Sequence, residues 1–191
     1  VALAALDHVV AGAGRHDDQM LGRLEVRQGH PLAVEGVAFP EKAHIALPEQ
    51  AALEEAGLPY RSRLLAQGDQ DKPEYRAIQP FGQVPIFEEN GFTLFETGAI
   101  VLHIGQRSET LLPHDPAARS HATQWLIAAL NSIEPFVMDV ARIDLFYKDQ
   151  EWAKLRRPGA VEFAHRRLGG LSKALGEKLY LDGDRFTAGD L

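Results

Sequence analysis

The sequence predicts an α/β domain followed by an all-α domain. The α/β half is indicated by a hairpin signal at residues 86–95, where Asn90-Gly91 separates two short strands and an apolar helical pattern follows at once. The all-α half is indicated by two stripes of apolar residues at helical spacing, at residues 122–140 and 161–179. A chain of 191 residues is long enough for one large domain or two small ones.

In chain order, four segments are expected. Residues 1–48 have no clear pattern, except that 32–39 partly alternates and is a candidate replacement strand. Residues 49–107 form the α/β domain. Residues 108–118 contain the turn residues of a linker. Residues 119–191 form the helical domain.

The α/β domain is expected to contain a helix end, a strand, a polar loop, the hairpin and a closing helix, at Glu54-Glu55, 60–65, 69–74, 86–95 and from Glu96 onwards. In the helical domain, Pro135 should kink the first long helix, because proline cannot donate a backbone hydrogen bond. The second stripe should pack against the first stripe or against the α/β domain.

The last residues carry a capping signal. The Thr187 side chain would cap a helix and Asp190 would reach back to it, as in a capping box. The helix that this signal should start is absent, so the sequence predicts a truncated helical domain. Apolar surface would then be left exposed and stability reduced.

Composition excludes several functions. The net charge of −7, without a basic cluster, argues against nucleic-acid binding. No apolar run is long enough to cross a membrane, and the apolar start lacks a basic leader, so the cytoplasm is the expected location. With no cysteine, neither a disulfide nor a cysteine nucleophile is possible. The eight histidines lack metal-ligand spacing, so no metal site is expected.

Three runs stand in a specific order: residues 52–60, which read ALEEAGLPY, residues 79–86, which read QPFGQVPI, and Glu96-Thr97 at the head of a helix. Together they resemble the glutathione S-transferase family. The resemblance implies a thioredoxin-like N-terminal domain, here with its first strand replaced or missing, and a helical C-terminal domain. It also implies glutathione as co-substrate and a homodimer.

The resemblance also implies roles for five residues. Val84-Pro85 would be a cis bond, and the Val84 backbone would pair with the cysteinyl part of glutathione like an added strand. Thr97 would bind the γ-glutamyl carboxylate and Glu96 its ammonium, while Gln83 would contribute weakly. Independently, the first turn of a helix attracts an anion through its free N–H groups and its dipole.

The N-terminal segment does not fit this family. The hydroxyl that activates the thiol should lie near residues 39–49, yet this window holds no Ser, Thr, Tyr or Cys. The activating group is therefore not identified, and His44 is only a weak candidate. Residues 1–48 are either a divergent N-terminus or the product of a shifted frame or fragment gene model.

The first functional expectation is a transferase that conjugates the glutathione thiolate to a small apolar electrophile. The second is a non-catalytic module of the same fold that binds glutathione or a protein. A glutathione-dependent isomerase or dehalogenase is a third. Trp125 and Phe136 either line an apolar substrate pocket or belong to the core.

Overall fold

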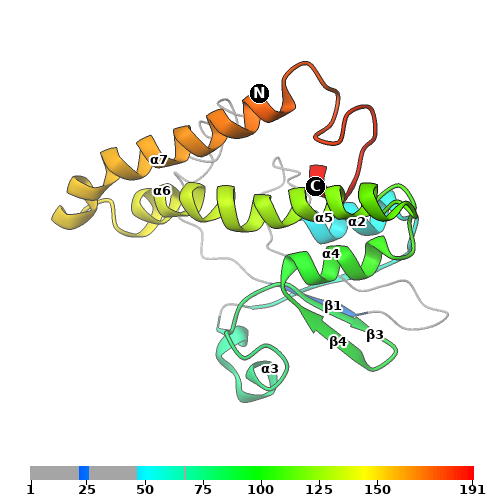
Figure 1. The fold of residues 1–191 in the computed structure, drawn as a ribbon. Helices are drawn as coiled ribbons and strands as arrows, with labels where there is room; N and C mark the ends of the chain where they lie inside the picture. Colours follow the sequence, from blue (N-terminus) through cyan, green and yellow to red (C-terminus); the bar gives the residue numbers. More distant parts are fainter. Residues whose placement is uncertain (1–21, 26–46, 67) are drawn as a thin grey trace.

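The structure is a computed structural model, which describes residues 22–25, 47–66 and 68–191. Figure 1 shows helix α4 (Thr97–Gly105) between a small set of strands and a long helical rod, with helix α7 (Glu151–Leu175) beside the C-terminal part of the rod. The candidate strand at 32–39, His44 and residues 39–46 of the expected hydroxyl window lie outside the described residues.

The strands form two antiparallel pairs. Strand β1 (Gly22–Glu25) pairs with β2 (Arg61–Leu64), and β1 also lies against β3 (Ile86–Glu89). Strands β3 (Ile86–Glu89) and β4 (Phe92–Phe95) form the hairpin expected from the sequence. Its turn residues, Asn90 and Gly91, have φ of 52° and 82°, and this pair of positive values is what a type I′ turn requires.

The helices of the α/β half follow from local signals. Helix α2 (Pro48–Glu55) starts at a proline, which is well placed in a first turn because its missing N–H has no partner there. The loop after β2 contains a short 3₁₀ turn, η1 (Asp69–Asp71), and the four-residue helix α3 (Pro73–Arg76). Helix α4 (Thr97–Gly105) begins directly after the hairpin, with Glu96 at its N-cap.

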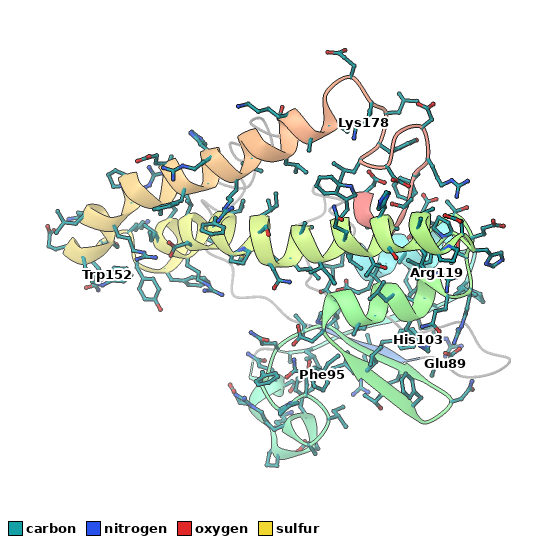
Figure 2. All side chains as sticks on the ribbon, in the orientation of Figure 1. Glu89, Phe95, His103, Arg119, Trp152 and Lys178 are labelled. Atoms are coloured by element: carbon teal, nitrogen blue, oxygen red, sulfur yellow. The ribbon has the colours of Figure 1, made fainter. Side chains whose placement is uncertain are left out.

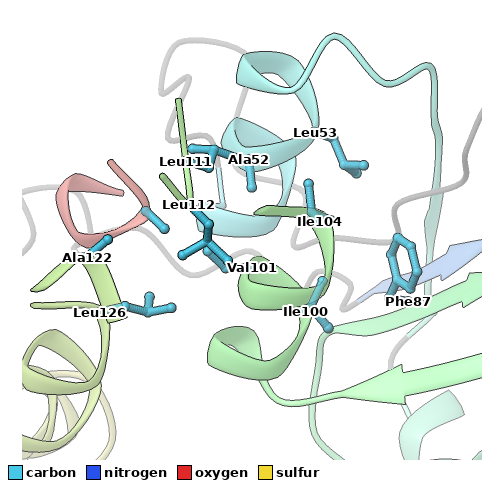
Figure 3. Close-up of a cluster of buried hydrophobic side chains, with 11 residues drawn as sticks. Ala52, Leu53, Phe87, Ile100, Val101, Ile104, Leu111, Leu112, Ala122 and Leu126 are labelled. Carbon is cyan, nitrogen blue, oxygen red and sulfur yellow. The ribbon is translucent and has the colours of Figure 1, made fainter. Parts of the chain in front are cut away.

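Helix α4 is central to the main core. Ile100, Val101 and Ile104 of this helix are fully buried, and Figure 3 shows them between α2, the hairpin and the linker. Leu126 of the next helix completes the contact with the helical half. The remaining buried members of this core are Ala52, Leu53, Phe87, Leu111, Leu112, Ala122 and Ala188. One continuous core therefore joins the two halves of the chain.

The rod consists of α5 (Pro116–Ala128), a π-helical turn η2 (Ala129–Ile133) and α6 (Glu134–Phe146). The expected disturbance at Pro135 appears as this π-helical turn just before it. Proline cannot donate to the carbonyl four residues earlier, and a wider turn accommodates that loss without ending the rod.

Helix α7 (Glu151–Leu175) lies along α6, where the end of the first apolar stripe packs against the start of the second. Ala122 and Leu126, earlier in the first stripe, are instead buried in the core around α4. It starts ten residues before the second stripe and contains Pro158. Small side chains on α7, such as Ala153 and Ala164, allow close approach to Val140 and Ile143 of α6. The sequence expectation of a stripe reaching Leu179 was too long, because the chain leaves the helix at Gly176 and Leu179 is exposed.

The capping box at the end of the chain is present. The Gly189 N–H donates to the Thr187 hydroxyl at 3.2 Å, and the Thr187 N–H donates to Asp190 Oδ2 at 2.9 Å. The short 3₁₀ turn η3 (Ala188–Asp190) packs against α5. Within the described part of the chain, no helix combines the length and the apolar character needed to cross a bilayer.

Candidate functional site

A cavity of about 600 Å³ lies between the two halves of the chain. Its walls come from the loop before β3, the N-terminus of α4, and the π turn with α6. This volume is within the usual range for a small-molecule site. The lining residues are Gln79, Gly82, Gln83, Val84, Glu96, Thr97, Gly98, Leu130, Asn131, Glu134, Met138 and Arg142.

The first wall is the N-terminal turn of α4. Glu96 has φ of 73°, an uncommon conformation for a residue with a side chain, and such residues cluster at ligand-binding sites. No side chain caps this helix. Because the first turn of an α-helix has N–H groups without partners inside the helix, it can bind an anion.

The second wall is the loop from Gln79 to Pro85. The Tyr75 hydroxyl donates to the Gln83 carbonyl at 2.7 Å, and the Phe81 N–H donates to Gln79 Oε1 at 2.7 Å. Tyr75 and Gln79 are buried, so each hydrogen bond has one partner that is shielded from water. The Val84-Pro85 bond is cis, as the resemblance implied. The two hydrogen bonds, from Tyr75 and to Gln79, therefore hold in place the loop that carries Val84.

The third wall was not anticipated from the sequence. Leu130, Glu134, Met138 and Arg142 recur every four residues and therefore lie along one face of the rod. The spacing of four is present in the sequence, but it overlaps the apolar stripe at 122–140, and that stripe indicates a packed helix and not a cavity wall. The π turn contributes Leu130 and Asn131, so the irregularity before Pro135 lies at the cavity itself.

Two carboxyl groups near the cavity have perturbed ionisation. Partial burial raises the pKa of Glu134, an effect that the nearby Arg142 opposes and Glu96 reinforces. Burial also raises the pKa of Glu49, which is 1% exposed, although the Thr97 hydroxyl acts against this as a hydrogen-bonding partner. Among the described residues, Glu49 Oε2 has no hydrogen-bond partner.

Four of the five residues proposed from the sequence line the cavity, namely Gln83, Val84, Glu96 and Thr97. The fifth, Pro85, is buried and does not line the cavity. The other suggested pocket residues lie elsewhere. Trp125 lines a separate apolar hollow under the C-terminal segment, and Phe136 packs against α7, where its ring stacks on Phe163 with centroids 6.3 Å apart.

Comparison with known proteins agrees with this architecture. Residues 42–106 match the family model of the glutathione S-transferase N-terminal domain. A glutathione S-transferase-like protein of Aspergillus terreus is 35% identical over 143 residues, which are 72% of this chain and 57% of that protein. The disulfide-bond oxidoreductase YghU of Escherichia coli is 27% identical over 174 residues, which are 85% of this chain and 58% of that protein.

Solved structures give the same result. A theta class glutathione S-transferase from Xanthomonas axonopodis, with glutathione bound, has a TM-score of 0.68 at 25% identity, covering 90% of this chain and 78% of that one. Poplar glutathione transferase F1 has a TM-score of 0.69 at 28% identity, covering 84% and 77%.

A thioredoxin-like half, a helical half and the cavity between them therefore define a protein of transferase fold. The chain belongs to the glutathione S-transferase family. It spans little more than half the length of these two curated relatives.

Proposed function

We propose that this chain binds glutathione in the cavity between its halves and that the protein conjugates the glutathione thiolate to an electrophile. The observation that carries the proposal is the meeting of Val84, Glu96 and Thr97 at one cavity. The three residues offer a backbone pairing edge, a carboxylate and a hydroxyl at a helix N-terminus. These groups complement a tripeptide with an ammonium and a carboxylate at one end.

Each part of glutathione has a partner in this proposal. The γ-glutamyl carboxylate accepts hydrogen bonds from the free N–H groups at the start of α4 and from the Thr97 hydroxyl, which gives up its contact with Glu49 to donate its single proton. Its ammonium binds the Glu96 carboxylate. The cysteinyl backbone pairs with Val84, and Gln83 adds a weaker contact at the edge. The family relationship supports glutathione as the ligand, because related structures contain it.

The chemistry requires a group that stabilises the thiolate. A free thiol has a pKa of about 8.5, so only a few per cent is ionised at neutral pH. The expected window at 39–49 contains no hydroxyl or thiol side chain. This absence favours a second candidate, a glutathione-binding module that does not conjugate. The two candidates share the binding site and differ in turnover.

The test is calorimetric titration of the purified chain with glutathione, beside the variants Glu96→Ala and Thr97→Ala. Each variant should weaken binding by about 10- to 100-fold, the range for hydrogen bonds to charged groups. Glu55→Ala and Thr110→Ala remove the same groups from exposed positions outside the cavity and should bind like the parent. If Glu96→Ala and Thr97→Ala bind glutathione as tightly as the parent, the proposed site is contradicted.

A conjugation assay on the same sample separates the two candidates. Turnover with an activated haloarene supports the transferase, whereas tight glutathione binding without turnover supports the non-catalytic module. The absorbance of bound thiolate, followed against pH, shows directly whether the protein lowers the thiol pKa. An unshifted thiol pKa would rule out transferase chemistry.

A further inference from the structure

Helix α6 carries two aspartates whose charges are already paired. Arg156 of α7 donates to Asp139 with an Nη2–Oδ2 distance of 2.7 Å, and Arg157 donates to Asp144 with an Nε–Oδ1 distance of 2.7 Å. Both aspartates are therefore held by α7. Neither is left to balance Arg142, which lies between them in the sequence.

Arg142 has a different environment. It lines the cavity, and it makes no hydrogen bond or ion pair with any residue that the structure describes. Its charge acts on Glu134, two turns earlier on the same face. An unpaired guanidinium at a cavity wall is a binding group for an anion, because its planar N–H groups match a carboxylate in a two-point contact.

The order of groups along the wall assigns a place to that anion. Glu134 lies near Glu96, at the end where the proposed site takes the γ-glutamyl group. Arg142 follows two turns later, with Met138 between them. Met138 is 37% exposed and offers an adaptable apolar surface. The wall thus presents an apolar contact followed by a cationic one.

We infer that Arg142 makes the protein selective for electrophiles that carry a carboxylate or similar anionic group, with Met138 against their apolar part. This inference rests on the proposed glutathione site, and it adds an anionic group to the apolar electrophile expected from the sequence. Glu134 does not favour an anion, but it lies towards the γ-glutamyl end. The apolar part of the electrophile would lie between it and Arg142.

Conjugate analogues test the inference without requiring turnover. Calorimetry with S-(4-carboxybenzyl)glutathione and S-benzylglutathione compares a ligand that has the anion with a ligand that lacks it. The parent protein should bind the carboxylate ligand about tenfold more tightly, a moderate value for a partly solvated charge pair. Arg142→Ala should remove this preference, and Arg142→Lys should keep part of it.

A matched control separates local from general charge effects. Lys148→Ala removes one positive charge from an exposed position outside the cavity and should keep the full preference. Equal binding of the two ligands by the parent protein overturns the inference and leaves the glutathione site standing. Loss of affinity for glutathione itself in Arg142→Ala also overturns it, because Arg142 would then bind glutathione. If the parent binds neither glutathione nor the analogues, the proposed function itself fails.

Discussion

Arg107 holds Glu89 with both terminal nitrogens of its guanidinium. Nη1 donates to Oε1 at 2.7 Å and Nη2 donates to Oε2. His103 Nε2 lies 3.3 Å from Glu89 Oε2, and Figure 2 shows the two residues close together at this end of the hairpin. This two-point ion pair joins the C-terminal end of α4 to strand β3. The helix that presents Glu96 and Thr97 is therefore fixed to the hairpin at its opposite end.

Glu89→Gln should lower the free energy of unfolding by about 1 kcal/mol at neutral pH, because a two-point pair at a partly buried position exceeds an ordinary surface ion pair. Urea denaturation measures the change. Glu55→Gln, at an exposed position on α2, should leave stability within error of the parent.

The same pair predicts an acid dependence. The hydrogen bond from Arg107 lowers the pKa of Glu89 below its ordinary 4.5, although desolvation opposes this. Its stabilisation is present above 4.5 and is lost as the pH falls through the folded-state value. The stability difference between the parent and Glu89→Gln should therefore shrink in acid. A difference that stays constant from neutral pH into strong acid would exclude the ion pair as its cause.

Glu49→Gln should stabilise the protein at neutral pH by about 1 kcal/mol, because a buried carboxylate with an unpaired oxygen carries a desolvation penalty. Burial raises the folded-state pKa of Glu49 above 4.5. The folded state then binds the proton more tightly, so the penalty develops as the pH rises from 4.5 through the folded-state pKa. Thermal unfolding at several pH values should show the two proteins converging in acid. A gap that widens in acid contradicts this account.

Gly189→Ala should destabilise the protein by about 1–3 kcal/mol, the usual range for overpacking. An added Cβ would lie 2.5 Å from Trp125 Cβ and 3.1 Å from the Ala122 carbonyl oxygen, and neither atom can move without shifting α5. Gly170→Ala is the matched control. It lies inside α7 with nothing within 4 Å of the new Cβ, so it should stabilise the helix by up to about 1 kcal/mol. Equal effects in urea denaturation would show that η3 does not pack tightly on α5.

Tyr75→Phe tests the support of the cavity loop. Removing the hydroxyl leaves the Gln83 carbonyl without its donor and should free the Gln83–Pro85 segment. We expect glutathione affinity to fall by several-fold, on the order of 1 kcal/mol, while the ring keeps its buried position. Calorimetry gives the affinity and urea denaturation gives the stability. A loss of stability with unchanged affinity would make Tyr75 a core residue only.

Much of the α/β half could be predicted because its signals are local. Asn90-Gly91 specifies the tight turn, and the end of the hairpin leads directly into α4. Thr187 and Asp190 specify their capping box in the same way. Strand β1 was not predicted, because its pairing with β2 joins segments far apart in the sequence and residues 22–25 carry no distinct alternation. The N-terminal extent of helix α7 was also underestimated. Pro158 indicates a helix break, but the helix continues through it and packs on α6.

The sequence by itself determined the family, the hairpin, the cis bond implied at Val84-Pro85, and the residues that approach the cavity from the α/β half. The hairpin depends on the short-range chemistry of its turn, whereas the cis bond and the site residues were implied by the family resemblance. Only the tertiary structure brought Asn131, Glu134 and Arg142 to the opposite wall and set Glu49 behind Thr97. The positions of these residues depend on how the rod packs across α4 through the shared core. Local propensity carries no information about which face of a helix such packing turns towards a cavity.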